Sequence, residues 1–573
     1  MLFGGDYNPE QWPEGVWAAD IELMRRANVN LVTVGVFAWS RMQPAPDEFD
    51  FDWLDRVLTL LGAAGIGVCL ATPTASPPPW FTRAHPDAMP VTREGVRLTH
   101  GSRDTYCVNA PAYRTASVRI ASELAARYAG HGAVRLWHVH NEYGTACYCD
   151  HCAAEFRNWL AARYGDVETL NDAWSADFWS QRYRCWPEVL PPRATQYLAN
   201  PAHELDYRRF VSDAMLRHYL DQRAVLRRAG PAPVTTNFVL GGWVPVDHAR
   251  WAREVDVVAI DDYPSSVADH LAERAFAADR ARGWALAAGH PDGRWLLMEH
   301  APGAVRDRSG VVRPLPAGGA RDAALTYLDR GALGVLYFQW RASRGGAEQW
   351  HPAIVPHEGD RTPVFDEISV LGAEVARRVP ATVSARIALI HDEQSMWAWQ
   401  SPHLPTREID YEAMVRRWHG TLAAGGAMVD VVPVTAPLRR YDLVAAPALY
   451  LMPAAAHTAL REYVSGGGTL VLTFACGLVD DCSRATPGAL DDLIGARVLR
   501  HVPLLPGETE ALAGVDAVGR RWLDHLEPAG ATVLLRTADG RPAVTEHHFG
   551  AGVVRYAATD LDERRFTRML FER

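Results

Sequence analysis

Lysine is absent from all 573 residues, so every strongly basic side chain is an arginine. Without lysine the chain cannot form a Schiff base, hold a phosphate through a P-loop lysine, or bind pyridoxal phosphate in the usual way. The sequence also lacks any stretch of 18 consecutive apolar residues, and no basic and apolar leader follows Met1. We therefore expect a soluble, cytoplasmic protein with no membrane partner.

A strong basic patch is missing as well, because the net charge of -10 is spread along the chain. Nucleic acids and anionic membranes both select basic surfaces, so neither is an expected partner. The composition is otherwise that of a globular protein, with 48% hydrophobic and 22% charged residues. At this length the chain is expected to form more than one domain.

Cysteines are few, and half of the eight fall into one group made of Cys107, Cys147, Cys149 and Cys152. In a cytosolic chain, clustered cysteines bind a metal more often than they form disulfides. Four thiolates suit a closed, tetrahedral, structural zinc site, with His151 as a bystander or substitute ligand. Reduced cysteines without a metal are the alternative. The other four are scattered and are expected to be small buried residues.

Short apolar runs alternate with segments of helical periodicity over the first 380 residues, which predicts an α/β fold. Eight such units fit a (β/α)8 TIM barrel with insertions better than an open sheet. The predicted strands are 2–6, 30–39, 65–73, 134–141, 234–239, 256–263, 295–299 and 334–340. The predicted helices include 17–27, 51–61, 113–128 and 206–228.

Each predicted strand ends in polar residues, and the carboxyl ends of barrel strands form the active site of this fold. Glu142 follows the fourth strand and Glu299 ends the seventh, on opposite sides of the barrel. Two carboxylates across a glycosidic bond are what glycoside hydrolysis needs, one as acid and one as nucleophile or base. A structural ion pair with an arginine is the alternative explanation for either glutamate.

A second domain is predicted from 381 to 573, after the barrel domain of 1–380 with its zinc-binding insertion. New strands at 387–390, 443–446, 450–452, 469–473 and 553–557, with a helix at 455–464, indicate a Rossmann-like α/β domain. The three glycines at 466–468 follow a helix, so we interpret them as a helix end and turn.

The barrel segment carries a series of motifs in one order. They are WHVHNEYG at 137–144, LLME at 296–299, YNPEQWP at 7–13, FAWS at 37–40, TPTASPP at 72–78, SR at 102–103, YCVN at 106–109, FWSQRY at 178–183 and RGGAE at 344–348. With these motifs the chain resembles glycoside hydrolase family 42, the β-galactosidases.

The resemblance implies a retaining exo-glycosidase that releases β-D-galactose from small oligosaccharides or galactosides, with Glu142 as acid/base and Glu299 as nucleophile. It assigns Arg103, Asn141, Tyr263, Glu348, His351 and Trp179 to the sugar site, and Trp12 and Trp340 are weaker candidates. It also implies a structural zinc on the four clustered cysteines, and a homotrimer formed in part through the second domain.

Two departures from the family pattern stand out. Family members follow the nucleophile with Met-Glu-x5-Val-Asn-Trp, whereas this chain has Arg306 and Asp307 in place of Asn-Trp, which removes an expected wall of the sugar site. The family's usual small C-terminal β domain is expected to be absent. The alternatives that remain are an α-L-arabinopyranosidase and a degenerate, non-catalytic sugar-binding homologue.

Overall fold

The computed structural model describes residues 1–424 and 426–561. It divides the chain into two compact units. The first comprises Met1–Trp159, Leu190–Ala194 and Arg209–Val383, and the second comprises Leu160–Val189, Thr195–Arg208 and Ser384–Arg573. The boundary at Val383 lies three residues beyond the predicted one, and two segments within the predicted barrel domain are grouped with the second unit.

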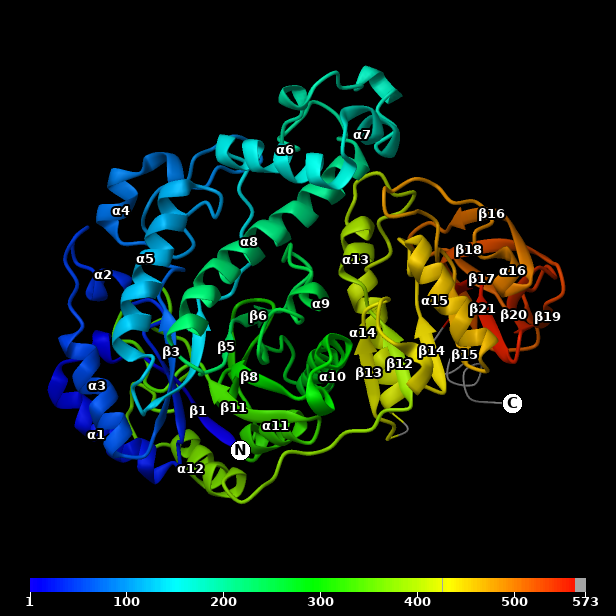
Figure 1. Cartoon of the computed structure of the whole chain (residues 1–573). Coiled ribbons are helices and arrows are strands. Elements are labelled where there is room, and N and C mark those ends of the chain that lie inside the picture. The colour runs from blue at the N-terminus through cyan, green and yellow to red at the C-terminus, as the bar shows by residue number, and fades with distance from the viewer. Residues whose placement is uncertain (425, 562–573) are drawn as a thin grey trace. The chain divides into compact units, whose positions relative to one another are not determined.

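The first unit contains a parallel barrel (Figure 1). Its strands follow one another in the sheet in the order β5-β4-β3-β2-β1-β11-β8-β7-β6. The two end strands, β5 and β6, are separated in the chain by Thr236 alone, so together they form one barrel strand and the sheet closes on itself. The strands are β1 (Leu2–Tyr7), β2 (Leu31–Val34), β3 (Gly67–Thr72), β4 (Val134–Val139), β5 (Val234–Thr235), β6 (Asn237–Val239), β7 (Val258–Asp261), β8 (Trp295–Glu299) and β11 (Ala332–Tyr337).

All eight predicted barrel strands are present, although most are shorter than predicted. The second one was predicted to reach Trp39, but β2 ends at Val34 and Gly35 follows with a φ of 88°. Trp39 instead begins a short helix, where its indole N–H donates to Oε1 of Gln43 at 2.9 Å. A glycine with positive φ ends the strand at a position where most side chains would be strained.

Within the first unit, helices follow the barrel strands in sequence and cover the barrel. In α3, the buried residues Trp53, Leu54, Val57, Leu58 and Leu61 recur at helical spacing and form the apolar stripe of the helix. The main helices of this part of the chain are α1 (Glu14–Arg26), α2 (Trp39–Met42), α3 (Asp52–Ala63), α4 (Pro79–Ala84), α5 (Pro111–Tyr128), α6 (Asp150–Tyr164), α7 (Val167–Ala173), α8 (Pro201–Ala229), α9 (His248–Trp251), α10 (His270–Ala288), α11 (Gly319–Leu328) and α12 (Pro363–Val375).

The core of the barrel brings side chains from six strands together. One cluster of buried residues contains Leu31, Cys69, Leu136, Ala259, Leu296, Met298 and Leu336. Cys69 is fully buried there and Cys476 is also buried, as predicted for the scattered cysteines. Cys185 is exposed and Cys482 is half-buried, so the prediction was wrong for these two. Packing in the barrel core fixes the strand ends on which the functional side chains stand.

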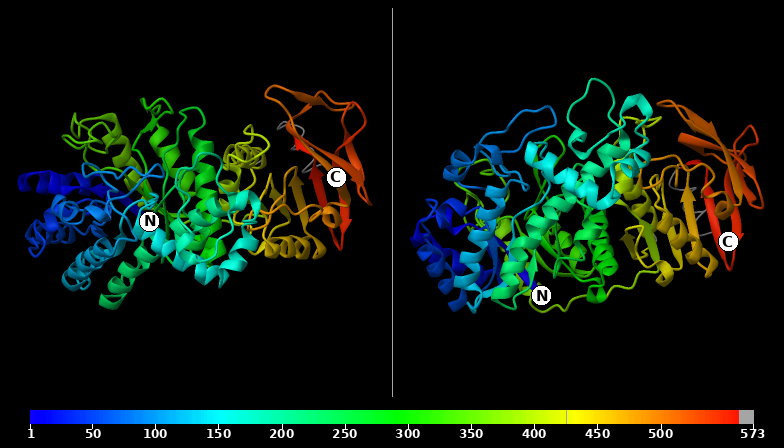
Figure 2. Two further views of the ribbon diagram at one scale, coloured as in Figure 1. Left: turned by 90° about the horizontal axis from the view of Figure 1, so that it is seen from above. Right: turned by 45° about the horizontal axis from the view of Figure 1, so that its top comes forward.

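The second unit has a mixed sheet in the order β13-β12-β14-β15-β21-β20-β19. The first five strands are parallel, as expected of a Rossmann-like domain, and β20 and β19 continue the sheet antiparallel. Figure 2 shows the antiparallel strands of this unit in orange and red. A separate sheet joins β16, β18 and β17, with β22 on β18.

The elements of the second unit differ in part from the prediction. The predicted strand at 450–452 is only a single bridge between Leu451 and Val479, and the antiparallel strands were not predicted. Gly466 caps the end of α15 and Gly467 has a φ of 103°, so the glycine run is the predicted helix end. The elements are β12 (Ile387–Ile390), α13 (Glu393–Trp399), α14 (Tyr411–Ala423), β13 (Val429–Val432), β14 (Leu443–Ala446), α15 (Ala454–Ser465), β15 (Thr469–Thr473), α16 (Asp491–Ile494), β16 (Ala496–Pro503), β17 (Thr509–Ala511), β18 (Val518–Pro528), β19 (Thr532–Arg536), β20 (Pro542–Phe549), β21 (Gly552–Ala557) and β22 (Thr559–Asp560).

No helix among residues 1–424 and 426–561 is both long and apolar enough to cross a membrane.

Candidate active site

Glu142 and Glu299 meet at the carboxyl ends of the barrel strands. Glu299 is the last residue of β8, and Glu142 follows β4 by three residues. One carboxylate oxygen of each, together with one of Asp261, lies within 4.8 Å of the others. Burial raises the pKa of Glu299 well above its usual value, and the charges of Asp6 and Glu142 raise it further. Three carboxylates this close cannot all be ionised, so the site holds at least one proton.

Arg103 and Asn141 both approach Glu142. Arg103 pairs through Nη2 with Oε2 of Glu142, and its Nε lies 3.3 Å from a carboxylate oxygen of Asp104. The amide nitrogen of Asn141 lies 3.4 Å from the same Oε2. The Arg103 side chain is 37% exposed, so the ion pair stands at the open mouth of the barrel, where a ligand can reach the guanidinium. The structural alternative for Glu142 was an ion pair with an arginine. Such a pair is present, but the arginine in it is not buried.

Tyr263 and His351 lie beside Glu299. The Tyr263 hydroxyl donates to Oε2 of Glu299 at 2.8 Å, and its ring meets the ring of His351 edge-on at 5.6 Å. His351 also packs edge-on against Phe338 at 4.8 Å. Tyr263 therefore holds the carboxylate directly, while His351 reaches the site from the loop after β11.

Glu348 belongs to the same loop, and its backbone carbonyl accepts the backbone N–H of His351 at 2.9 Å. Burial raises the pKa of Glu348, the positive charge of Arg103 lowers it and the negative charge of Glu142 raises it. The carboxylate therefore lies within electrostatic reach of both residues at the barrel mouth.

Asn237 and Asp261 were not among the predicted site residues. Asn237 begins β6 and Asp261 ends β7, and both are buried. The amide nitrogen of Asn237 lies 2.9 Å from Oδ1 of Asn141, 2.5 Å from Oδ2 of Asp261 and 3.1 Å from Oε1 of Glu299. The signal in the sequence was a buried polar residue within each apolar run, which by itself does not reveal which groups it contacts.

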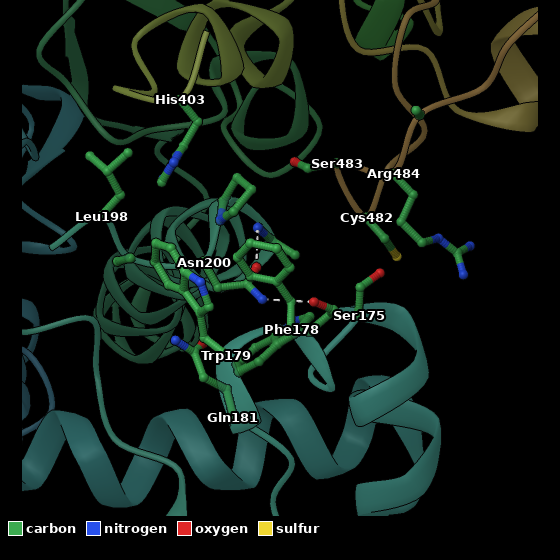
Figure 3. A pocket seen from close by; sticks show the side chains of 15 residues that line it. Ser175, Phe178, Trp179, Gln181, Leu198, Asn200, His403, Cys482, Ser483 and Arg484 are labelled. Carbon is green, nitrogen blue, oxygen red and sulfur yellow. Dashed lines mark hydrogen bonds between the residues drawn. The ribbon is translucent and has the colours of Figure 1, made fainter.

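The predicted aromatic residues are not gathered at the carboxylates. Trp179 lies in the second unit, 62% exposed, at a cavity of about 530 Å³, and Figure 3 shows it there beside Phe178. None of its described contacts is with the carboxylates, so its role in sugar binding stays a prediction. Trp340 is fully buried against Phe365, so its selection as a pocket residue was wrong. Trp12 lies under two guanidinium groups, those of Arg341 and Arg344.

Arg306 and Asp307 stand where the family pattern has Asn-Trp, and they build a hairpin between β9 (Ala304–Arg306) and β10 (Val312–Pro314). The Asp307 carboxylate accepts the backbone N–H groups of Ser309 at 2.9 Å and Val311 at 3.1 Å, which closes the turn. The Arg306 charge lowers the pKa of Glu348 and of His351. Arg306 therefore places a positive charge near the loop that carries Glu348 and His351.

The four clustered cysteines converge as the sequence predicted. Their sulfurs all lie within 4.8 Å of one another, and the distances from Cys107 to Cys149 and Cys152 are 3.5 and 3.4 Å. All four are buried and none forms a disulfide. His151 instead contacts Asp87, with Nε2 3.0 Å from the carboxylate. A tetrahedral zinc with Zn–S bonds of about 2.3 Å needs sulfurs about 3.8 Å apart, so the donor set fits this ion.

Comparison with known proteins identifies relatives over the whole chain. Residues 6–378 match the family model Glyco_hydro_42, described as beta-galactosidase, and residues 385–573 match the model described as beta-galactosidase trimerisation domain. The β-galactosidase bgaB of Geobacillus kaustophilus is 37% identical, with 100% of this chain and 86% of that protein covered. A β-galactosidase of Arthrobacter sp. is 38% identical, with 97% of this chain and 82% of that protein covered.

Solved structures of β-galactosidases are also similar to this chain over its whole length. The β-galactosidase from Bacillus circulans sp. alkalophilus has a TM-score of 0.92 at 32% identity, covering 100% of this chain and 87% of that one. The β-galactosidase from Halorubrum lacusprofundi has a TM-score of 0.94 at 32% identity, covering 100% of this chain and 90% of that one.

Proposed function

Because the chain belongs to glycoside hydrolase family 42, the β-galactosidases, we propose that Glu142 and Glu299 release terminal β-D-galactose from small β-galactosides with retention of configuration. The chain is an enzyme of the glycoside hydrolase class, and its activity on β-galactosides follows from the family. The observation that carries the stereochemical proposal is the approach of the two carboxylates to within 4.8 Å. Retaining enzymes need about 5 to 5.5 Å between the two groups, whereas inverting enzymes need about 6.5 to 9.5 Å to admit a water.

The reaction proceeds by two displacements. In the first, a carboxylate oxygen of Glu299 attacks the anomeric carbon while Glu142 gives its proton to the departing glycosidic oxygen. In the second, Glu142 takes a proton from water, which attacks the same carbon and releases galactose. Each displacement inverts the anomeric carbon, so the product keeps the β configuration.

The environment of Glu299 supports its role as nucleophile. A nucleophile must be ionised, and burial among other carboxyl groups opposes this by raising the pKa of Glu299. The O–H of Tyr263 and the amide of Asn237 both donate to the carboxylate and so stabilise its charge. The two donors therefore offset part of the effect of burial and favour the ionised form that attacks.

The remaining site residues are proposed to bind the sugar. Arg103 and Asn141 present N–H donors beside Glu142, and Glu348 and His351 present an acceptor and an imidazole from the loop after β11. Galactose hydroxyls are neutral and need both donors and acceptors, which this set provides.

A panel of nitrophenyl glycosides tests the substrate. We expect the highest kcat/KM on the β-galactoside. A preference for the α-L-arabinopyranoside, which lacks only the C6 hydroxymethyl group, would change the substrate assigned. Activity only on β-glucosides or β-xylosides would refute the galactose specificity.

Glu142→Ala should lose activity and recover it with azide, forming galactosyl azide of β configuration. Glu299→Gln should show no turnover at any azide concentration that rescues Glu142→Ala.

We also propose that Cys107, Cys147, Cys149 and Cys152 hold a structural zinc. The convergence of four buried thiols supports this, and four protein ligands leave no open position for catalysis. The zinc would fix the loop after Glu142, since Cys147 follows it by five residues. Elemental analysis of the purified enzyme should give one zinc per chain, and the absence of zinc after purification in zinc-containing buffer would refute the proposal.

We propose that the enzyme is a homotrimer. The match of residues 385–573 to a trimerisation-domain model supports assembly through the second unit. Light scattering of the full chain should give a mass of three protomers, and a monomer at micromolar concentration would refute this.

A further inference from the structure

One amide group contacts both halves of the catalytic pair. Oδ1 of Asn237 accepts the backbone N–H of Glu142 at 2.8 Å, and Nδ2 of the same side chain lies 3.1 Å from Oε1 of Glu299. Asn237 is 1% exposed, so these bonds form away from water. A rigid planar group therefore spans the space between the residues that carry the acid/base and nucleophile roles.

The orientation of this amide follows from its neighbours. A backbone N–H can only donate, so the atom facing Glu142 must be the amide oxygen. The same oxygen lies 2.9 Å from Nε2 of His138, and burial lowers the pKa of that imidazole to about 4. His138 is thus neutral near pH 7 and carries its proton on Nε2, because its partner there is an acceptor. The nitrogen of Asn237 must then face the acidic side of the site.

Glu142 needs such a partner because its backbone lies in the left-handed region, with a φ of 46°. A residue other than glycine is strained in this region, and the surroundings must offset the strain. The bond from its N–H to Asn237 fixes this conformation and with it the direction of the Glu142 side chain. At the other end, two hydrogens on Nδ2 serve the oxygens of Asn141, Asp261 and Glu299, so one hydrogen is shared.

We propose that Asn237 is a positioning residue that sets the separation of the two catalytic carboxylates, through the backbone N–H of Glu142 and through Oε1 of Glu299. This inference rests on the proposed roles of Glu142 and Glu299. Asparagine suits the position because it combines an acceptor with a donor in one plane. Aspartate keeps the acceptor and loses the donor, and alanine loses both.

The test compares kcat/KM for two β-galactosides, one with a nitrophenyl leaving group and one with an alkyl leaving group. A nitrophenolate departs with little help from an acid, whereas an alkoxide needs the proton of Glu142. Asn237→Ala should lower kcat/KM by about 10²-fold on the nitrophenyl substrate and by clearly more on the alkyl substrate, because misplacement of the acid adds to misplacement of the nucleophile. Asn237→Asp should lower kcat/KM for the two substrates to the same extent, because the aspartate oxygen still accepts the backbone N–H of Glu142.

Thr236→Val is the matched control, since Thr236 is the neighbouring residue, equally buried, and its hydroxyl has no hydrogen-bond partner within the described part of the chain. In Thr236→Val, kcat/KM for both substrates should stay within about twofold of the wild-type value, because a methyl group of similar size replaces a hydroxyl that makes no hydrogen bond to a described residue. Near-UV circular dichroism checks folding, and the isosteric Asn237→Asp keeps the test decisive if alanine disrupts the core.

Two results would overturn the inference. One is a folded Asn237→Asp enzyme that keeps its wild-type kcat/KM on both substrates. The other is an Asn237→Ala enzyme in which kcat/KM falls by the same factor for both substrates, as expected if the role of Asn237 is purely structural. If wild type itself fails to hydrolyse galactosides, or azide does not rescue Glu142→Ala, the proposed function has failed instead.

Discussion

Removal of the Tyr263 hydroxyl is expected to shift the pH dependence of the enzyme. The hydroxyl donates to Oε2 of Glu299 at 2.8 Å, and Glu299 is only 6% exposed. Burial raises the pKa of Glu299, with the charges of Asp6 and Glu142 acting in the same direction, while the bond from Tyr263 lowers it. In Tyr263→Phe that opposing contribution disappears, so the pKa of Glu299 rises further.

The size of the shift follows from the strength of the bond. A hydrogen bond to a charged group contributes about 1.5 to 3 kcal/mol. We take the lower end, about 1.5 kcal/mol, because Tyr263 is 39% exposed and water can partly replace it. Since one pH unit corresponds to about 1.36 kcal/mol, the pKa of Glu299 should rise by about one unit.

The assay is the pH profile of kcat/KM on a nitrophenyl β-galactoside, which reports the ionisation of the free enzyme. Glu299 must be ionised to attack, so activity is lost as the pH falls through its pKa. The acidic limb of Tyr263→Phe should therefore move to higher pH by about one unit. Tyr337→Phe is the control, because that tyrosine is also in the barrel but its hydroxyl has no hydrogen-bond partner among the described residues. An acidic limb that coincides in Tyr263→Phe and wild type would refute the reasoning.

Three other variants test further parts of the structure. Cys149→Ser should lower the melting temperature and the zinc content together, as a closed site contributes to folding; an unchanged melting temperature would argue against the metal. Arg341→Met should destabilise the protein by about 3 to 5 kcal/mol in urea unfolding, because Asp20 is 0% exposed and would lose its ion-pair partner; a loss below about 1 kcal/mol would contradict this. Arg306→Ala should raise the pKa of Glu348, which the Arg306 charge lowers, and change KM more than kcat; an unchanged KM would show that this charge does not reach the sugar site.

The sequence predicted the class of fold and the two glutamates that we propose as the catalytic pair. Eight apolar runs alternating with helical segments gave the barrel, because the periodicity of burial is a local property of the chain. Glu142 and Glu299 were recognisable since each lies at the end of such a run, where an unpaired carboxylate is unfavourable without a function. The four cysteines were also recognisable, as three of them are close in sequence.

Other features depended on tertiary structure. Asp261 lies opposite Glu299 through the pairing of β7 with β8. Asn237 reaches both Glu142 and Glu299 because β5 and β6 form one strand that pairs with β4 on one side and β7 on the other, which closes the barrel. Trp340 has the sequence position of a pocket residue, yet packing against Phe365 buries it. Strand periodicity shows that a side chain is buried, whereas its partners depend on strand order and register, which are properties of the whole sheet. The sequence therefore predicted which residues carry the proposed chemistry, whereas the placement of one amide between them required the folded barrel, since strand order is a property of the whole sheet.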